Sequence, residues 1–223
     1  MNFSIKAVWL TICYVLVCLI DILAVAMNLD WLESAVKPLL MPILMLLYLM
    51  MSNHRNKLLL TALFFSLLGD ILLLDKTQFF VYGLGSFLIS QLVYVLLFFP
   101  AVKNGSMSNW IKAIVPFALY LLILLKLLFP HLDSFFLPVL IYAVAICLFG
   151  LISLMQVLEK KPYSALLLSG AVLFIISDSM IAINKFYQAF DGAGIAIMLT
   201  YVSAQYLIVQ FVLKREKLEE SIT

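Results

Sequence analysis

Long apolar stretches, separated by short polar breaks, run along almost the whole chain. A helix needs about 20 apolar residues to cross a bilayer core of about 30 Å. Runs of this kind predict spans near residues 7–27, 35–51, 58–74, 79–99, 110–129, 134–155, 163–183 and 192–213. None of the breaks between them could hold a soluble domain. We therefore predict an all-α, polytopic transmembrane helix bundle of about eight spans, with residues 1–223 forming a single integral membrane domain.

The composition agrees with this fold class. Of 223 residues, 65% are hydrophobic and only 12% are charged, and the mean hydropathy is +1.15. A soluble domain usually has about a quarter of its residues charged, so the apolar surplus is expected to face lipid. The net charge of +2 is spread along the chain, which excludes the basic surface of a nucleic-acid-binding protein. The three cysteines lie inside apolar runs, at spacings that fit neither a zinc site nor a disulfide framework.

Basic residues near the span ends predict the orientation in the membrane. With a cytoplasmic N-terminus, ten of them face the cytoplasm, namely Lys6, Arg55, Lys57, Lys103, Lys112, Lys160, Lys161, Lys214, Arg215 and Lys217. The opposite side keeps four, namely Lys37, Lys76, Lys126 and Lys185. This bias follows the positive-inside rule and places both termini in the cytoplasm. The charged stretch 214–220 is expected to be a solvated helical extension of the last span.

Three aspartates lie within predicted spans, namely Asp21, Asp70 and Asp178. Placing an ionisable side chain within a bilayer costs free energy. Such a residue therefore indicates, by default, a functional site that faces the bundle interior. At 1.5 Å per helical residue, Asp70 lies about 20 Å from the cytoplasmic end of its span and Asp178 about 25 Å from Lys161. These two carboxyls are therefore expected at similar depths. Asp21 lacks their matching sequence context, and a structural role explains it equally well.

The sequences around Asp70 and Asp178 also match each other. Each aspartate follows a small residue and an apolar run, and the next span in each case carries a glutamine, Gln91 or Gln205. Both aspartate-bearing spans run in the same direction, so the pattern suggests a 4+4 internal repeat of the parallel kind. Convergent membrane composition would produce a similar pattern, so the repeat is a hypothesis.

Two carboxyls that face one cavity in a low-dielectric interior would not both ionise. Desolvation and mutual repulsion leave a neutral acid beside a carboxylate, which supplies a general acid and a general base in one site. We predict that Asp70 and Asp178 share one cavity, with their carboxyls within about 10 Å of each other. The alternative is that each aspartate caps a kink or pairs with a nearby Lys or Ser, but the default interpretation of intramembrane acids favours function.

Other polar positions give weaker signals. Lys37 precedes Pro38 at the start of a span, where it could reach an anionic headgroup or, more commonly, snorkel to the interface. Gln205, one turn after Tyr201, either lines a cavity or forms a hydrogen bond between helices. Six tyrosines are expected mostly in the interfacial belts, namely Tyr48, Tyr82, Tyr94, Tyr142, Tyr163 and Tyr187. Three prolines within spans predict kinks, namely Pro42, Pro116 and Pro138.

Four stretches, residues 37–42, 65–70, 177–186 and 200–206, resemble the lysoplasmalogenase family of eight-span membrane proteins. The resemblance covers roughly Ala35 to Leu213, and its specific parts are the two Asp motifs and the Tyr-x-x-x-Gln motif. It implies a hydrolase that cleaves the vinyl ether bond of lysoplasmalogens to a fatty aldehyde and glycerophospho-ethanolamine or -choline. It implies that Asp70 and Asp178 are catalytic. Where the family pattern leads us to expect a histidine, this chain has Gln91, which cannot titrate.

The proposed chemistry requires neither a metal nor another cofactor, because a carboxylic acid can protonate a vinyl ether and a carboxylate can assist water. The expected partners are a lysophospholipid substrate and the bilayer itself, in a bacterial cytoplasmic (inner) membrane. The oligomeric state is left open. The candidate substrate-binding residues are Lys37, Ser66, Asn184, Lys185, Tyr201 and Gln205.

Three other classes of protein compete with the hydrolase. An intramembrane aspartyl protease also uses two aspartates, but its Tyr-Asp, Gly-x-Gly-Asp and Pro-Ala-Leu motifs are not matched here. A proton-coupled transporter would use buried aspartates as proton relays, and it remains open. A non-enzymatic lipid-binding or scaffold protein would leave the cost of burying the acids unexplained.

Overall fold

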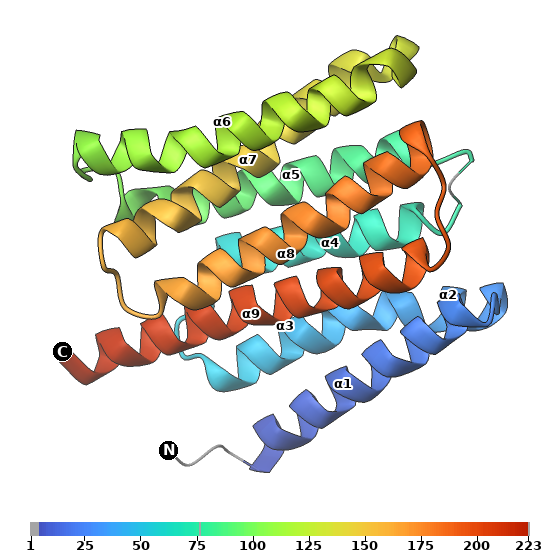
Figure 1. Cartoon of the computed structure of the whole chain (residues 1–223). Coiled ribbons are helices and arrows are strands. Elements are labelled where there is room, and N and C mark those ends of the chain that lie inside the picture. Colours follow the sequence, from blue (N-terminus) through green and yellow to red (C-terminus); the bar gives the residue numbers. More distant parts are fainter. Residues whose placement is uncertain (1–4, 76, 223) are drawn as a thin grey trace. The chain divides into compact units, whose positions relative to one another are not determined.

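The computed structural model describes residues 5–75 and 77–222, and these residues are helical almost throughout (Figure 1). No β-strand occurs in the two described ranges, so the predicted all-α class is confirmed. The α-helices are α1 (Ile5–Ala26), α2 (Asp30–Val36), α3 (Leu40–Met51), α4 (Lys57–Leu72), α5 (Phe80–Phe98), α6 (Met107–Leu128), α7 (Phe136–Leu158), α8 (Ser164–Ala182) and α9 (Ala193–Ile222). Short helical turns are η1 (Lys37–Leu39), η2 (Phe99–Ala101), η3 (Phe129–His131), η4 (Asp133–Phe135) and the π-helical η5 (Ile183–Tyr187).

Seven helical stretches among the described residues are long and apolar enough to cross a membrane. They are Val8–Ala26, Asp30–Met51, Phe80–Ala101, Met107–His131, Asp133–Leu158, Ser164–Tyr187 and Ala193–Ser221. The predicted span near 58–74 corresponds to α4, which has only 16 residues. The polytopic helical bundle is therefore confirmed, with α4 shorter than expected. Lys76, used above for the orientation, lies outside the described residues.

Prolines and polar caps explain where several helices begin. Pro38 has no N–H, and η1 separates α2 from α3 at this residue. Pro42 and Pro138 lie in the first turns of α3 and α7, where the backbone N–H that proline lacks would have no partner within the helix. Of the three expected kink sites, Pro116 alone therefore lies inside a helix. The Asn56 side chain accepts a hydrogen bond from the Leu59 N–H at the start of α4, at 3.2 Å.

A polar contact also joins the start of α6 to the end of α7. Ser106 caps α6 by accepting a hydrogen bond from the Asn109 N–H at 3.2 Å. The Glu159 carboxylate, just after α7, accepts hydrogen bonds from the Asn109 side chain at 2.8 Å and the Ser106 N–H at 3.0 Å. These bonds, chiefly the one from Asn109, hold the pKa of Glu159 below its usual value. The contact is therefore present at neutral pH and weakens as the pH falls through the lowered pKa of Glu159.

The chain forms two compact units. The first comprises the residues up to Val93 together with those from Val209 onward, and the second comprises Tyr94–Ile208. In the first unit α3 packs against α1 and α4; in the second, α7 packs against α6 and α8 (Figure 1). The unit boundaries fall inside α5 and α9, so the units do not coincide with the four-helix halves of the suspected repeat.

Within the first unit, α4 and α5 approach each other closely at two levels. The Ser90 hydroxyl of α5 donates a hydrogen bond to the Ala62 carbonyl of α4 at 2.9 Å. Two turns further along α4, a Cβ atom built on Gly83 would lie 3.5 Å from the Gly69 carbonyl oxygen. Small residues at both levels allow the two backbones this proximity.

Within the second unit, α8 and α9 make the corresponding contacts. A Cβ atom built on Gly170 would lie 3.1 Å from the Ala204 carbonyl oxygen, and the Ser177 hydroxyl donates to the Ile197 carbonyl at 3.1 Å. Asp178 can be aligned with Asp70, and Gln205 with Gln91. In this alignment Gly170 and Ser177 of α8 fall at the positions of Ala62 and Gly69 of α4. Ala204 and Ile197 of α9 fall at the positions of Ser90 and Gly83 of α5. The two helix pairs therefore pack in the same register, which supports the internal repeat.

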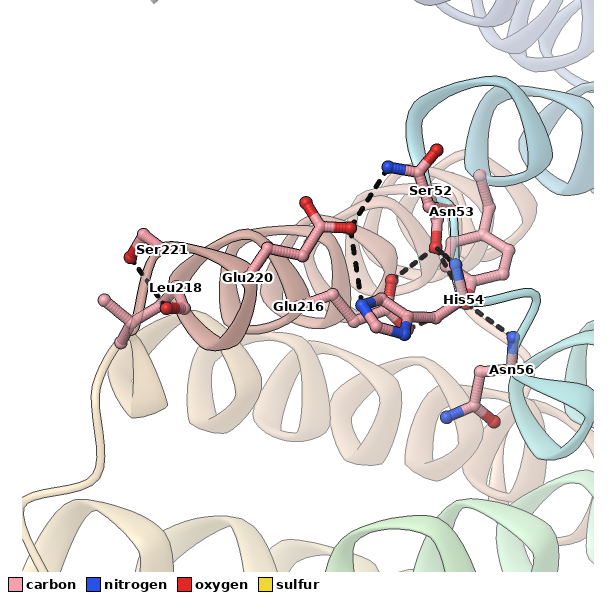
Figure 2. A network of polar contacts seen from close by, with 9 residues as sticks. Ser52, Asn53, His54, Asn56, Glu216, Leu218, Glu220 and Ser221 are labelled. Carbon is pink, nitrogen blue, oxygen red and sulfur yellow. Dashed lines mark hydrogen bonds and ion pairs between the residues drawn. The ribbon is translucent and has the colours of Figure 1, made fainter. Parts of the chain in front are cut away.

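The sequence led us to expect that the C-terminal part of α9 is a solvated extension. It is instead anchored in the first unit (Figure 2). Glu216 is only 9% exposed, and its carboxylate accepts hydrogen bonds from the Tyr48 hydroxyl at 2.8 Å and the Ser52 hydroxyl at 2.6 Å. Glu220 pairs with His54 at 3.4 Å. These contacts fasten α9 to the end of α3 and to the loop between α3 and α4.

Replacement of Glu216 by alanine should therefore lower stability by about 1–3 kcal/mol, because two hydroxyls lose a charged acceptor in a buried position. Glu219→Ala is the matched control, since Glu219 is largely exposed and pairs with Arg215 on the surface, where such pairs contribute about 0–1 kcal/mol. The unfolding temperatures of the two variants in detergent measure the difference. Equal temperatures would show that the Glu216 contacts do not anchor α9.

Candidate active site

Asp70 lies near the end of α4 and is buried, with 4% of its surface exposed. The preceding Gly69 explains how α5 packs beside it, because a Cβ atom at that position would lie 2.5 Å from a ring carbon of Phe87. A side chain at position 69 would therefore push the ring away. The η1 turn also contacts α4. Since α3 and α4 are antiparallel and Lys37 and Asp70 lie about equally far from the turn between them, the two residues belong to the same end of the unit.

Ser66, one turn before Asp70, is fully buried and lies on the interior face of α4. Its hydroxyl is hydrogen-bonded to the Ser90 hydroxyl of α5 at 2.8 Å. The structure thus gives Ser66 a role in joining α4 to α5. Contact of this hydroxyl with a substrate stays a prediction.

Asp178 lies on α8 and is half-buried. The Tyr142 hydroxyl of α7 donates a hydrogen bond to its carboxylate. Beside it, the Ser179 hydroxyl is hydrogen-bonded to the Tyr120 hydroxyl of α6 at 2.5 Å. Two tyrosines from two different helices thus surround the Asp178–Ser179 pair, and both contacts lie within the second unit.

Three of the tyrosines expected in the interfacial belts lie in the interior instead. Tyr48 and Tyr94 are fully buried and Tyr142 is 7% exposed, and each donates a hydrogen bond to a carboxylate or amide oxygen. The belt interpretation was wrong for these three. Tyr82, Tyr163 and Tyr187 are exposed, as expected.

Gln205 and Tyr201 lie inside the second unit, on the face of α9 that packs against its neighbours. Gln205 is fully buried, and its side-chain oxygen accepts a hydrogen bond from the Tyr94 hydroxyl at 2.6 Å. Tyr201 packs edge-on against Phe174 of α8, with ring centroids 5.6 Å apart. Of the two roles that the sequence left open for Gln205, the structure shows the interhelical hydrogen bond.

Asn184 and Lys185 lie in η5, the π-helical turn that ends α8. Such π-helical turns are rare in proteins, and those that occur often lie at functional sites. The Asn184 side-chain oxygen accepts a hydrogen bond from the Phe190 N–H at 3.2 Å, which orders the connection to α9. The Lys185 side chain is exposed.

Lys37 is 8% exposed, and its ammonium group is paired with Glu33 of α2, one helical turn earlier. Whether it also reaches the membrane interface stays a prediction. The charges of Lys37 and Glu33 also act on Asp21 of α1. The η1 turn that carries Lys37 contacts both α1 and α4. The first unit thus gathers ionisable groups from α1, α2 and η1 at the end of the unit to which Asp70 belongs.

Two buried polar side chains of the first unit have no hydrogen-bond partner among the described residues. They are Asp21, through both carboxylate oxygens, and Gln91, through its amide oxygen and nitrogen. Both residues are fully buried. Such groups are costly in a protein interior unless a ligand or water completes them.

The predicted site residues therefore fall into two groups. Asp70, Ser66 and Lys37 lie in the first unit; Asp178, Asn184, Lys185, Tyr201 and Gln205 lie in the second. A cavity shared by Asp70 and Asp178 stays a prediction. Among the described residues, no group of three or more His, Cys, Asp or Glu side chains is arranged to hold a metal ion.

The helices and the buried acids define a multi-pass helical membrane protein with ionisable groups inside its spans. Residues 32–212 match the model of the YhhN family, and the chain belongs to this family. Asp21 lies before the matched region.

The chain is also similar to proteins that are named lysoplasmalogenases. It is 32% identical, over 161 residues, to the protein named "Lysoplasmalogenase" from Mycobacterium bovis and to that of the same name from Mycobacterium tuberculosis. Each match covers 70% of this chain and 60% of the mycobacterial protein, so the chain spans about three fifths of those relatives. It is 33% identical, over 187 residues, to human "Lysoplasmalogenase TMEM86B", with 81% of this chain and 75% of the human protein covered. No solved structure was found to match the chain.

Proposed function

We propose that the protein is a membrane-embedded hydrolase that cleaves the vinyl ether bond of lysoplasmalogen-type lysophospholipids. The observation that carries this proposal is the presence of two interior carboxyls, Asp70 and Asp178, in a chain of the YhhN family whose named relatives are lysoplasmalogenases. The products are a fatty aldehyde and glycerophospho-ethanolamine or -choline.

The reaction needs one proton donor and one activated water. Protonation of the vinyl carbon remote from the oxygen breaks the carbon–carbon double bond and gives an oxocarbenium ion. Water adds to the carbon next to the oxygen and loses a proton, which forms a hemiacetal. The hemiacetal then breaks its bond to the glycerol oxygen, releasing aldehyde and alcohol. One water molecule is consumed, and no electrons are gained or lost.

Asp70 and Asp178 are proposed as the acid and the base of this reaction. A neutral carboxylic acid delivers the proton to carbon, and a carboxylate stabilises the cation and accepts the proton of the attacking water. Related two-carboxyl chemistry hydrolyses glycosides through an oxocarbenium-like transition state. The burial of Asp70 and the Tyr142 hydrogen bond that orients Asp178 support these roles.

Six further residues are proposed to hold the substrate. Lys37 and Lys185 supply positive charge for the phosphate, and Asn184 supplies an amide for the phosphate or glycerol. Ser66, Tyr201 and Gln205 line the path of the alkenyl chain and its ether oxygen. The burial of Ser66, Tyr201 and Gln205 and the exposure of Lys185 support this division.

A proton-coupled transporter is the second candidate, because the orphaned Asp21 and Gln91 are also what a polar translocation path would contain. One experiment separates the two. Purified protein in detergent, without metal or nucleotide, is incubated with an alkenyl lysophospholipid, and the same preparation is tested in proteoliposomes under a pH gradient. Release of long-chain aldehyde supports the hydrolase; no release, combined with pH-driven solute uptake, supports the transporter.

We further propose that the protein lies in the bacterial inner membrane with both termini in the cytoplasm. The ten-to-four distribution of basic residues supports this orientation. Cysteines placed at Asn104 and Asp133 should then react with an impermeant reagent from opposite sides of the membrane, and labelling of both from one side would contradict the orientation.

A further inference from the structure

The proposed reaction needs one neutral and one ionised carboxyl, and the contacts around Asp178 distinguish the two roles. One carboxyl oxygen of Asp178, Oδ2, accepts a hydrogen bond from the Tyr142 hydroxyl. Among the described residues, no hydrogen bond reaches its other oxygen, Oδ1, and no cation pairs with this carboxyl. The carboxyl is therefore held at one oxygen by a neutral donor and is open at the other.

The packing of the second unit places Tyr142 for this bond and places a second tyrosine beside it. Tyr142 is 7% exposed and lies on α7, which packs against α8. Tyr120 of α6 reaches the next residue of α8, since its hydroxyl lies 2.5 Å from that of Ser179. Ser179 already donates its single hydroxyl proton to the Ile175 carbonyl, so Tyr120 is the donor in this contact. Both tyrosines thus donate to α8, but of the two only Tyr142 donates to a carboxyl.

The Tyr142 hydroxyl fits an ionised Asp178 better than a neutral one. A hydrogen bond from a neutral hydroxyl to a carboxylate is stronger than the same bond to a neutral carboxylic acid. The bond also fixes the rotation of the carboxyl group, which leaves Oδ1 as the oxygen that can accept a proton from water. Asp70 is buried, with 4% of its surface exposed, and a neutral carboxyl costs less to bury than a charged one.

We propose that Tyr142 is a positioning residue that holds Asp178 as the carboxylate of the reaction, so that Asp70 is the acid. This inference rests on the proposed function. Asp70 gives its proton to the vinyl carbon, and Asp178 takes a proton from the attacking water through Oδ1. When the hemiacetal breaks, Asp178 returns its proton to the glycerol oxygen and Asp70 takes the proton of the hemiacetal hydroxyl. Both carboxyls are then in their starting forms.

Removal of the Tyr142 hydroxyl tests this role. Aldehyde release by the wild-type protein should fall at low pH, where Asp178 takes up a proton, and at high pH, where Asp70 loses its own. Tyr142→Phe should move the acidic limb of this profile to higher pH by about one unit, a tenfold change in proton affinity, and leave the alkaline limb in place. The KM should stay within about twofold, because the hydroxyl acts through Asp178 and not on the lipid.

Tyr120→Phe is the matched control, because it removes a hydroxyl that donates to Ser179 and not to a carboxyl. Both limbs should stay where they are in the wild-type protein. Movement of the alkaline limb in Tyr142→Phe would assign the acid to Asp178 and overturn the proposal. Unmoved limbs in Tyr142→Phe, or equal movement in the two variants, would overturn it by showing that the Tyr142 hydroxyl does not act on the charge of Asp178.

Infrared spectroscopy of the purified, substrate-free protein tests the assignment without turnover, and it serves also if Tyr142→Phe fails to fold. The C=O stretch of a neutral carboxylic acid is separate from the bands of carboxylates and shifts in D₂O. At neutral pH this band should lose intensity in Asp70→Asn and keep it in Asp178→Asn. Loss in Asp178→Asn, or no loss in either variant, would overturn the proposal. Failure of the proposed function gives a different signature, namely the expected infrared bands without aldehyde release from any alkenyl lipid.

Discussion

Asp70→Asn and Asp178→Asn are each expected to lower aldehyde release by a factor of about 10² or more, the usual loss when a general acid or base is removed. An amide has nearly the shape of the carboxyl but can neither deliver a proton to carbon nor accept one from water. Because the amide is also cheaper to bury than a charge, both variants should fold. The rate of aldehyde release, compared with the elution profile and unfolding temperature of each variant, measures the effect.

The matched control for these variants is Asp191→Asn. Asp191 is an exposed aspartate in the connection between η5 and α9, and it has no part in the proposed reaction. Its replacement makes the same chemical change and should keep the wild-type rate. If aldehyde release survives in both Asp70→Asn and Asp178→Asn, the two-carboxyl mechanism is wrong, although membership of the YhhN family is unaffected.

The second large effect concerns the bond that is cleaved. An alkenyl lysophospholipid should be hydrolysed, and the alkyl ether with the same chain and headgroup should be inert. A saturated ether has no double-bond carbon to protonate, so it forms no stabilised cation. An acyl lysophospholipid should also be inert, because the sequence has no nucleophile motif for ester cleavage.

Mass spectrometry of the three lipids after incubation with the same protein sample measures this selectivity. The three lipids are supplied in mixed micelles of the same composition, so that the protein meets each lipid at the same concentration in the same environment. Release of a fatty acid from the acyl lipid that depends on Asp70 or Asp178 would point to a different hydrolase chemistry. Equal turnover of alkyl and alkenyl lipids would exclude protonation of carbon as the first step.

Much of the fold could be predicted from the sequence because the bilayer imposes a simple requirement. Each predicted span falls on helical residues, since every backbone polar group in lipid must be bonded within its own segment. The span near 35–51 covers the end of α2, η1 and α3. The same reasoning found the buried Asp70, because an acid in an apolar run has few places to lie. The end of α4 was less predictable, since the apolar run continues beyond Leu72, where the helix stops.

The partners of these residues could not be predicted in the same way. In a uniformly apolar helix, no amphipathic pattern shows which face is interior, so Tyr142 was assigned to the interface although it bonds Asp178. A usable signal existed: Tyr142 and Asp178 lie about equally far from the turn between α7 and α8, and an antiparallel pair places them at one level.

Neither the ion pair of Lys37 nor the burial of Glu216 was predicted, and the reasons differ. The spacing of Glu33 and Lys37 is that of an i,i+4 helical pair and could have indicated their ion pair from the sequence. The burial of Glu216 depends on contacts with Tyr48 and Ser52, more than 150 residues earlier, which no local pattern reveals.

The most direct test of the proposed chemistry is hydrolysis of an alkenyl lysophospholipid in D₂O, with the aldehyde reduced to its alcohol as it forms. We predict one deuterium on carbon 2 of the product, because the acid that protonates the vinyl carbon exchanges with solvent. We also predict that oxygen from ¹⁸O-labelled water does not enter the glycerophospho product, whose oxygen comes from the substrate. An aldehyde without deuterium on carbon 2, or ¹⁸O in the glycerol, would contradict the mechanism.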